Sequence, residues 1–92
     1  MVKLYSIYDR MVPAHQQLFF AASDGVASRI IIETATGERN QLRQHSADFD
    51  LYRLGAVDQT SGIVAPEQAP VYIASVKQII DTQLEMERID HA

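Results

Sequence analysis

Tyrosine and basic side chains recur near the start of the chain in an arrangement that suits nucleic-acid binding. Lys3 and Tyr5 alternate along an apolar stretch, and Tyr8 and Arg10 follow at its end. Aromatic rings stack on unpaired bases, and basic groups pair with the phosphates between them. These residue types on a sheet would therefore suit a surface for single-stranded nucleic acid.

A tyrosine–arginine pair and a polar segment in the middle of the chain are further candidates for nucleic-acid contacts. Tyr52 and Arg53 are adjacent in the middle of the chain, so in a strand they would point to opposite faces. The polar segment 39–45 contributes Arg39 and Arg43, together with amide and imidazole donors. Its basic groups are further candidates for contacts with phosphates.

The same residues have a simpler structural interpretation, which spacing alone favours. Tyrosines often complete a core with their hydroxyls at its rim, and arginines cover apolar surface with their stems. The chain has 8 basic and 12 acidic residues, a formal net charge of −4. Because this overall charge opposes phosphate binding, any nucleic-acid site must depend on a local patch.

The sequence gives little support to catalysis or metal binding. It has no cysteine, which excludes disulfides, thiolate zinc sites and a cysteine nucleophile. The three histidines, His15, His45 and His91, lack the compact spacing of zinc ligands, so surface histidines are predicted. There is no Gly-x-Ser-x-Gly motif and no glycine-rich phosphate loop. We therefore expect a binding protein without a cofactor, and not an enzyme.

Length and hydropathy predict a single domain over residues 1–92, located in the cytosol. Ninety-two residues suffice for one core but not for two. No apolar run approaches the roughly 20 residues that a membrane helix requires, and the N-terminus lacks the features of a signal peptide.

The first third of the chain predicts a strand and a helix. Residues 2–8 are rich in β-branched and aromatic side chains and predict a strand, 10–17 predict a loop, and 18–22 predict a short second strand. Ser23 is a typical N-cap, and Gly37 fits the end of the helix that would follow.

The middle of the chain predicts a hairpin. Residues 38–48 are almost wholly polar and predict a solvated connection. Residues 49–57 predict a strand, 58–62 a turn, and 63–65 an antiparallel return. In the strand 49–57, alternation places four side chains on one face, namely Phe49, Leu51, Arg53 and Val57.

The last third predicts a connector and an amphipathic helix. Residues 66–70 contain two prolines and predict a rigid connector, although 71–73 are also compatible with a last short strand. Residues 73–88 then predict a helix, and 86–92 are expected to fray. The apolar stripe of this helix comprises Ile73, Val76, Ile80 and Leu84.

This stripe has two possible partners. Packing on the protein's own sheet is the favoured interpretation, because that is the usual place for such a face. The stripe is also a candidate protein interface, since a small sheet domain gains stability by forming a homodimer. The predicted fold is therefore α+β: a small antiparallel sheet, built from the N-terminal strand and the central hairpin, packed against a central and a C-terminal helix.

Three stretches resemble the small nonstructural protein of gokushovirus-like phages in the Microviridae. They are residues 4–10 (LYSIYDR), 50–55 (DLYRLG) and the turn 58–62. The resemblance covers about the first two-thirds of the chain and implies a DNA-binding protein of a phage with a single-stranded genome, acting in the infected bacterial cytosol. It implies no catalytic residues. The matching residues that would touch DNA are Tyr5, Tyr8, Arg10, Tyr52 and Arg53.

Two functions are therefore expected. The leading hypothesis is a noncatalytic accessory protein that binds single-stranded DNA in genome replication or packaging, with Tyr5 or Tyr52 stacking on bases. In that hypothesis the phosphates would meet Lys3, Arg10, Arg39, Arg43 and Arg53. The alternative is a small protein-interaction module, dimeric in one version, that engages a replication or assembly protein of the phage or its host.

Overall fold

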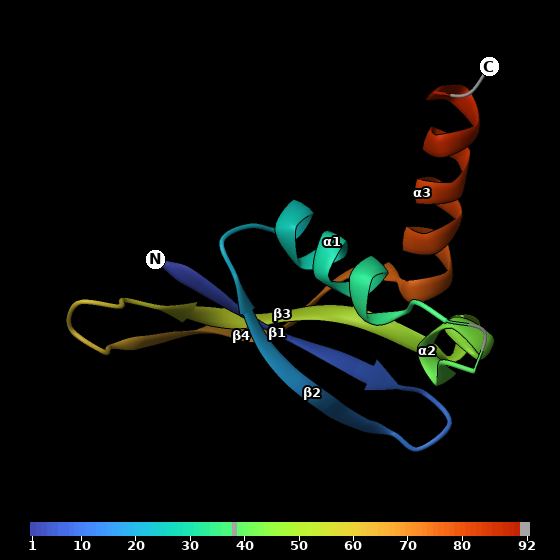
Figure 1. The fold of residues 1–92 in the computed structure, drawn as a ribbon. Coiled ribbons are helices and arrows are strands. Elements are labelled where there is room, and N and C mark those ends of the chain that lie inside the picture. The colour runs from blue at the N-terminus through green and yellow to red at the C-terminus, as the bar shows by residue number, and fades with distance from the viewer. Residues whose placement is uncertain (38, 91–92) are drawn as a thin grey trace.

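The computed structural model of the chain describes residues 1–37 and 39–90 and shows an α+β fold, as predicted. Its four strands form one antiparallel sheet in the order β2-β1-β3-β4 (Figure 1). The elements, in chain order, are β1 (Val2–Asp9), β2 (Ala14–Ala21), α1 (Asp24–Thr34), α2 (Gln41–Gln44), a 3₁₀ turn (Ser46–Asp48), β3 (Phe49–Val57), β4 (Val64–Ser75) and α3 (Val76–Asp90).

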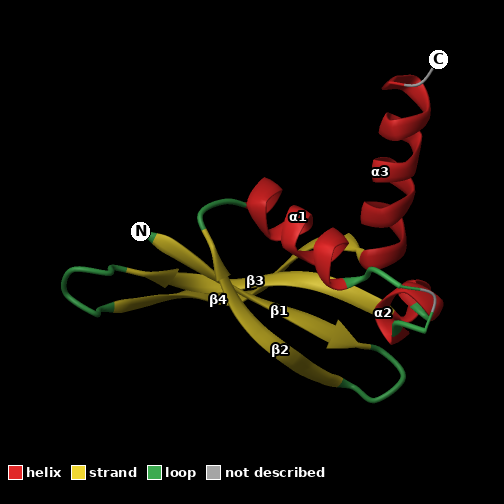
Figure 2. Ribbon diagram, in the orientation of Figure 1, coloured by secondary structure: helices red, strands yellow, loops and turns green. Residues whose placement is uncertain are grey.

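The two longer helices lie on the same side of the sheet. Helix α1 runs close above the strands, whereas α3 starts at the sheet and its C-terminal end points away from it (Figures 1 and 2). Among the described residues, no helix covers the opposite side of the sheet in these views. One face is therefore buried under helices, and the other face is open.

The core lies between the sheet and these helices. Tyr5 and Ile7 of β1 and Leu51 of β3 are buried there, with at most 3% of their surface exposed. They meet apolar residues of the helices, because alternate side chains of a strand point to the same face. The helices contribute the buried residues Ala27, Ile31, Val76 and Ile79.

Helix α1 begins and ends as the sequence predicts. Ser23 is its N-cap, and the Ser23 hydroxyl accepts a hydrogen bond from the backbone N–H of Val26 at 3.3 Å. The helix ends at Thr34, and Gly37 follows with φ of +92°, a conformation that glycine adopts without steric cost. Ile31 is fully buried, so the isoleucine run packs as part of a helix despite its preference for strands.

The predicted loop over residues 10–17 is wrong in its second half. Strand β2 begins at Ala14, and the connection from β1 is only residues 10–13. The ladder pairs Tyr8 with His15 and Asp9 with Ala14. Residues 14–17 show no apolar periodicity because this edge strand is largely exposed, and backbone pairing with β1 fixes its conformation.

The segment 38–48 also contains more structure than its polarity predicts. Residues 41–44 form α2, which Asn40 caps by accepting hydrogen bonds from the backbone N–H groups of Leu42 and Arg43. Leu42 is buried, with 4% of its surface exposed. One apolar side chain and one cap are enough to order this short turn against the core.

The predicted connector at 66–70 and the predicted helix start at Ile73 are both wrong. These residues lie in β4, whose register with β3 slips between the pairs Arg53↔Val71 and Gly55↔Pro66. A strand can accommodate prolines here because β4 is an edge strand. Helix α3 starts at Val76 and continues to Asp90, so residues 86–90 of the segment 86–92 that is predicted to fray are helical, and residues 91–92 lie outside the described residues.

We predict that Gly55→Ala destabilises the protein. A Cβ atom at this position would lie 2.8 Å from the carbonyl oxygen of Ala65 and 2.9 Å from Cα of Pro66. Both are backbone atoms, so β3 and β4 would have to separate, which should lower the free energy of unfolding by about 1–3 kcal/mol. Urea denaturation followed by circular dichroism measures this change.

The matched control is Gly25→Ala in the first turn of α1. There a Cβ would meet only the Ser23 hydroxyl oxygen at 3.8 Å, which is an ordinary contact. Equal or greater stability than wild type is expected, because alanine favours helix. Equal stability of Gly55→Ala and Gly25→Ala would contradict the tight approach of the two strands.

Candidate nucleic-acid interface

A row of aromatic side chains crosses the open face of the sheet, with one residue from each strand. Tyr8 of β1, His15 of β2, Tyr52 of β3 and Tyr72 of β4 contact one another. Ring centroids are 4.8 Å apart for Tyr8 and His15, 5.8 Å for Tyr8 and Tyr52, 5.2 Å for His15 and Tyr52, and 5.8 Å for Tyr52 and Tyr72. We call these four residues the aromatic row.

Strand register places the row on one face. Tyr8 is directly opposite His15, and Tyr52 is directly opposite Tyr72, and residues that face each other across antiparallel strands share a face. The neighbour of Tyr52 along β3, Leu51, is buried under the helices. Tyr52 must therefore point to the opposite, helix-free side.

The row is accessible from solvent. Tyr72 has 53% of its surface exposed, His15 is exposed, and Tyr8 and Tyr52 are half-buried. Phe20 of β2 adds apolar surface to the same face, since it pairs with Leu4 of β1 and is 56% exposed. An open sheet face with several exposed rings is unusual for a surface that only contacts water.

The cation next to the row is already paired. Arg10 follows β1, and its Nε atom lies 3.2 Å from Oδ2 of Asp50. Asp50 is opposite Tyr8 in the ladder and is buried, whereas the Arg10 side chain is 50% exposed. Arg10 can still reach a ligand, but Asp50 neutralises much of its charge.

A hydrogen bond between β1 and β2 holds the histidine of the row. His15 Nδ1 lies 2.7 Å from Oγ of Ser6, and Ser6 is fully buried. Ser6 is directly opposite Tyr52 in the ladder, so it lies beneath the centre of the row.

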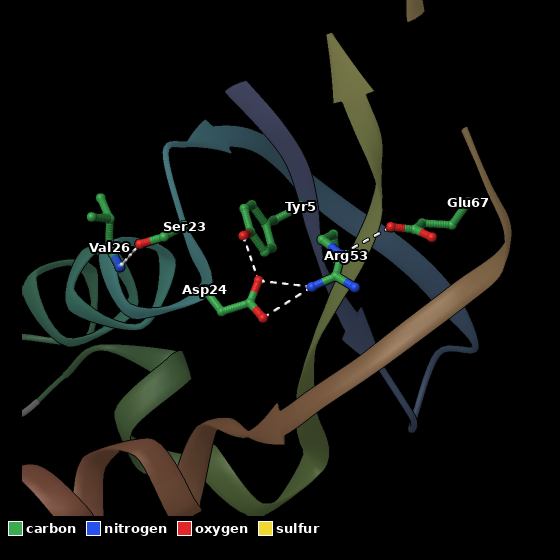
Figure 3. Close-up of polar contacts among 6 residues, drawn as sticks. All are labelled: Tyr5, Ser23, Asp24, Val26, Arg53 and Glu67. Carbon is green, nitrogen blue, oxygen red and sulfur yellow. Dashed lines mark hydrogen bonds and ion pairs between the residues drawn. The ribbon is translucent and has the colours of Figure 1, made fainter. Parts of the chain in front are cut away.

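Tyr5 cannot stack on a base, contrary to the prediction. It is fully buried on the helix side, where its ring stacks on Phe19 with centroids 5.6 Å apart. Its hydroxyl donates a hydrogen bond of 2.6 Å to Oδ1 of Asp24, in the first turn of α1 (Figure 3). Alternation along β1 brings Tyr5 to the covered face and Tyr8 to the open one.

Arg53 is also on the helix side, where two carboxylates hold it. Its Nη1 atom donates to Asp24 at 2.9 and 3.1 Å, and its Nε atom donates to Oε1 of Glu67 at 3.0 Å (Figure 3). The side chain is 22% exposed. Its charge is therefore used inside the fold, and the predicted contact with phosphate would require both pairs to break.

These contacts shift the ionisation of the three groups. The hydrogen bond from Tyr5, followed by those from Arg53, lowers the pKa of Asp24. Burial and the adjacent Asp24 raise the pKa of Tyr5. Hydrogen bonds to Glu67 and Asp24 raise the pKa of Arg53. The network is thus an ionised carboxylate held by a neutral phenol and a cation.

The remaining predicted cations lie away from the aromatic row. Lys3 is two residues before Tyr5 in β1 and so points to the same face, and its charge helps to lower the pKa of Asp24. Arg39 and Arg43 are exposed in and beside α2. Of the eight predicted nucleic-acid contacts, the structure brings together Tyr8 and Tyr52, with Arg10 beside them.

The predicted interface on the last helix does not form one exposed surface. Val76 is fully buried in the protein's own core, and Ile80 is partly buried against it. Ile73 is in β4, not in the helix, and also packs on the core. Only Leu84 of the four is largely exposed, at 48%. The intramolecular packing that the sequence favours accounts for the first part of the stripe.

Sequence reasoning missed three residues of the open face. His15 was assigned to a loop, Tyr72 to a segment of undecided structure, and Ser6 to no role. Ser6 and Tyr8 are two residues apart in a predicted strand, and this spacing predicts that they share a face. His15 and Tyr72 lie in segments that pair with the preceding strand of a hairpin but have no apolar alternation of their own, so no local pattern indicated them.

We also examined the described residues for a metal site, a groove and a membrane-spanning helix. Within residues 1–37 and 39–90, no group of three or more histidine, aspartate or glutamate side chains is placed to hold a metal ion. A groove of about 440 Å³ lies between α1 and α3, and Arg29, Ile32 and Met86 are among its lining residues. None of the described helices is long and apolar enough to span a membrane.

Comparison with known families identifies the chain. The family model described as phage ORF5 protein matches residues 2–79, which include all four strands and both residues, Tyr52 and Tyr72, at the centre and end of the aromatic row. The chain belongs to the phage ORF5 protein family. No curated protein and no solved structure shows significant similarity to this ORF5 protein.

We predict that Asp24→Asn lowers the stability of the protein at neutral pH and makes that stability less sensitive to acid. Because the folded state lowers the pKa of Asp24, its contribution is present above the unfolded pKa of about 4 and is lost as pH falls through the folded pKa. The expected loss at pH 7 is about 1–2 kcal/mol, limited by the 40% exposure of this side chain. Urea denaturation between pH 7 and pH 3 measures both effects.

Asp81→Asn is the control for this experiment. Asp81 forms an exposed ion pair with Lys77 on α3, which contributes little to stability. The free energy of unfolding of Asp81→Asn should therefore depend on pH as that of the wild type does. Parallel loss of stability in wild type and Asp24→Asn as the pH falls would show that the Asp24 network does not stabilise the fold.

Proposed function

We propose that this member of the family is a noncatalytic phage accessory protein that binds single-stranded DNA on the open face of its sheet. The observation that carries the proposal is the aromatic row, in which each of the four strands contributes one ring. The family supports a phage setting. The resemblance to gokushovirus-like proteins adds a role in genome replication or packaging, in the cytosol of the infected host.

The row suits unpaired bases. A base that is paired in a duplex has both faces covered by its neighbours, whereas an unpaired base can stack on an aromatic side chain. Base–aromatic stacking tolerates any sequence, because every base has a flat face. The row is therefore expected to bind single strands in preference to duplex and to show little sequence preference.

The rings are inclined to one another, which affects how a strand would lie. The Tyr52 ring makes angles of 75° with Tyr8 and 74° with Tyr72. Bases would therefore stack on separate rings and not form one continuous stack. Tyr72, the most exposed of the three tyrosines in the row, offers the most ring surface.

We predict that Tyr72→Leu and Tyr52→Leu weaken binding to a fluorescein-labelled oligo-dT. Each substitution removes one stacking surface but keeps a side chain of strand-compatible size. Loss of one stacked base is worth about 1–3 kcal/mol, so the dissociation constant should rise by roughly 5- to 150-fold. Fluorescence anisotropy at low salt measures it.

Tyr5→Phe is the matched control, since it changes a tyrosine on the covered face. It should bind DNA as the wild type does, after circular dichroism has confirmed that it folds. The absence of any binding by the wild type at low salt would refute the proposed function.

We further predict a shallow dependence of binding on salt. Among the side chains that the structure describes, Arg10 is the cation placed beside the row, and it is shared with Asp50. One phosphate contact gives a slope of about −0.7 in a plot of log K against log salt concentration. Arg39→Ala and Arg43→Ala should leave this slope unchanged, because both residues lie near α2; a steep slope that flattens in these variants would place the phosphates there instead.

A protein partner on the same face is the alternative. Leu18 and Phe20 of β2 and Tyr72 of β4 are each more than half exposed, and a second copy or another phage or host protein could cover them. Sedimentation velocity distinguishes this case. A wild-type dimer that becomes a monomer in Phe20→Ser, without DNA binding, would favour the interaction module.

A further inference from the structure

The histidine of the aromatic row differs from its neighbours because it offers a polar group of fixed direction. His15 is exposed, contacts the rings of Tyr8 and Tyr52, and directs Nδ1 at the Ser6 hydroxyl 2.7 Å away. The two ring nitrogens flank Cε1 and point in different directions. With Nδ1 engaged by buried Ser6 and the residue itself exposed, Nε2 is the ring nitrogen left for a ligand.

Burial of Ser6 determines which nitrogen carries the proton. A buried hydroxyl requires an acceptor for its own hydrogen, and Nδ1 of His15 is the side-chain partner that the structure gives to Ser6. If the neutral ring carried its proton on Nδ1, Ser6 would accept from it and would have to find another acceptor. The Ser6 hydroxyl therefore donates to Nδ1, and the ring proton is on Nε2.

We infer that His15 supplies a directed hydrogen-bond donor to an oxygen of a nucleotide that stacks on the row, and that Ser6 is the positioning residue that fixes this donor. The inference rests on the proposed function. A stacking ring binds every base alike, whereas an N–H group at Nε2 selects for an oxygen acceptor within reach. That oxygen belongs either to a base carbonyl, as in thymine, or to a phosphodiester.

Position in the row supports this assignment. The His15 ring lies 4.8 Å from Tyr8 and 5.2 Å from Tyr52, so a base on either tyrosine would have its edge near the imidazole. The carboxylate of Asp50, which lies opposite Tyr8 in the ladder, is paired with Arg10. His15 thus provides polar recognition where the surrounding rings provide none.

The tautomer can be tested in the free protein. A long-range ¹H–¹⁵N correlation spectrum at mildly alkaline pH, where an imidazole is neutral, reports which ring nitrogen of His15 is protonated. We expect the Nε2–H form in wild type and a mixture of both tautomers in Ser6→Ala. A wild-type ring protonated at Nδ1 would overturn the role of Ser6.

Binding tests the donor itself. His15→Phe keeps an aromatic ring but removes the N–H, so its dissociation constant for oligo-dT should rise about five-fold, the usual worth of one hydrogen bond. The double variant Ser6→Ala/His15→Phe should show the same loss while leaving no buried hydroxyl unpaired, which guards against misfolding of the single variant. His45→Phe makes the same substitution at an exposed histidine that follows α2, outside the aromatic row, so it is the matched control and should bind within about two-fold of wild type.

A second probe identifies the oxygen. Oligo-dA of the same length keeps the phosphates and a stacking face on every base, but adenine has no carbonyl oxygen. If His15→Phe weakens binding to oligo-dT alone, the donor meets a base carbonyl. If it weakens binding to both probes equally, the donor meets a phosphate. Wild-type binding that is unchanged in His15→Phe overturns this inference but leaves the aromatic row as the site, whereas no wild-type binding to either probe overturns the proposed function as well.

Discussion

The carboxylate of Asp24 holds helix α1 to the two central strands of the sheet. It accepts hydrogen bonds from Tyr5 of β1 and Arg53 of β3, and Arg53 extends the contact to Glu67 of β4 (Figure 3). Asp24 itself sits in the first turn of α1, where a negative charge also complements the helix dipole. Asp24 and Arg53 together thus join a helix to three of the four strands.

This network decides which face of the sheet is covered. With α1 held over Tyr5 and Arg53, the side chains that alternate with them must point to the opposite face. That face carries Ser6, Tyr8 and Tyr52, which meet His15 and Tyr72 from the edge strands. The aromatic row is therefore a consequence of covering the sheet on one side only, and the same alternation that buries Tyr5 exposes Tyr8.

The distribution of charge fits a surface that binds through rings. Most of the cations that a sequence reading assigns to phosphates lie elsewhere: Arg53 is committed to carboxylates, and Arg39 and Arg43 lie near α2. A net charge of −4 opposes binding of a polyanion, but stacking on aromatic faces does not depend on that charge. This reconciles an acidic chain with the proposed single-stranded DNA ligand, which a purely electrostatic surface would not.

The sequence by itself determined the α+β class, the N-cap at Ser23, the hairpin around residues 58–62 and the alternation that separates Tyr52 from Arg53, because each depends on neighbours along the chain. It did not determine β2 before Leu18 or β4 beyond Ala65, since backbone pairing with the preceding strand stabilises these polar and proline-containing segments, which have no apolar alternation of their own. Tertiary structure alone brought His15 and Tyr72 to Tyr8 and Tyr52, and alone withdrew Tyr5 into the core. Strand register decides which residues share a face, and register is a property of the assembled sheet, not of any one segment.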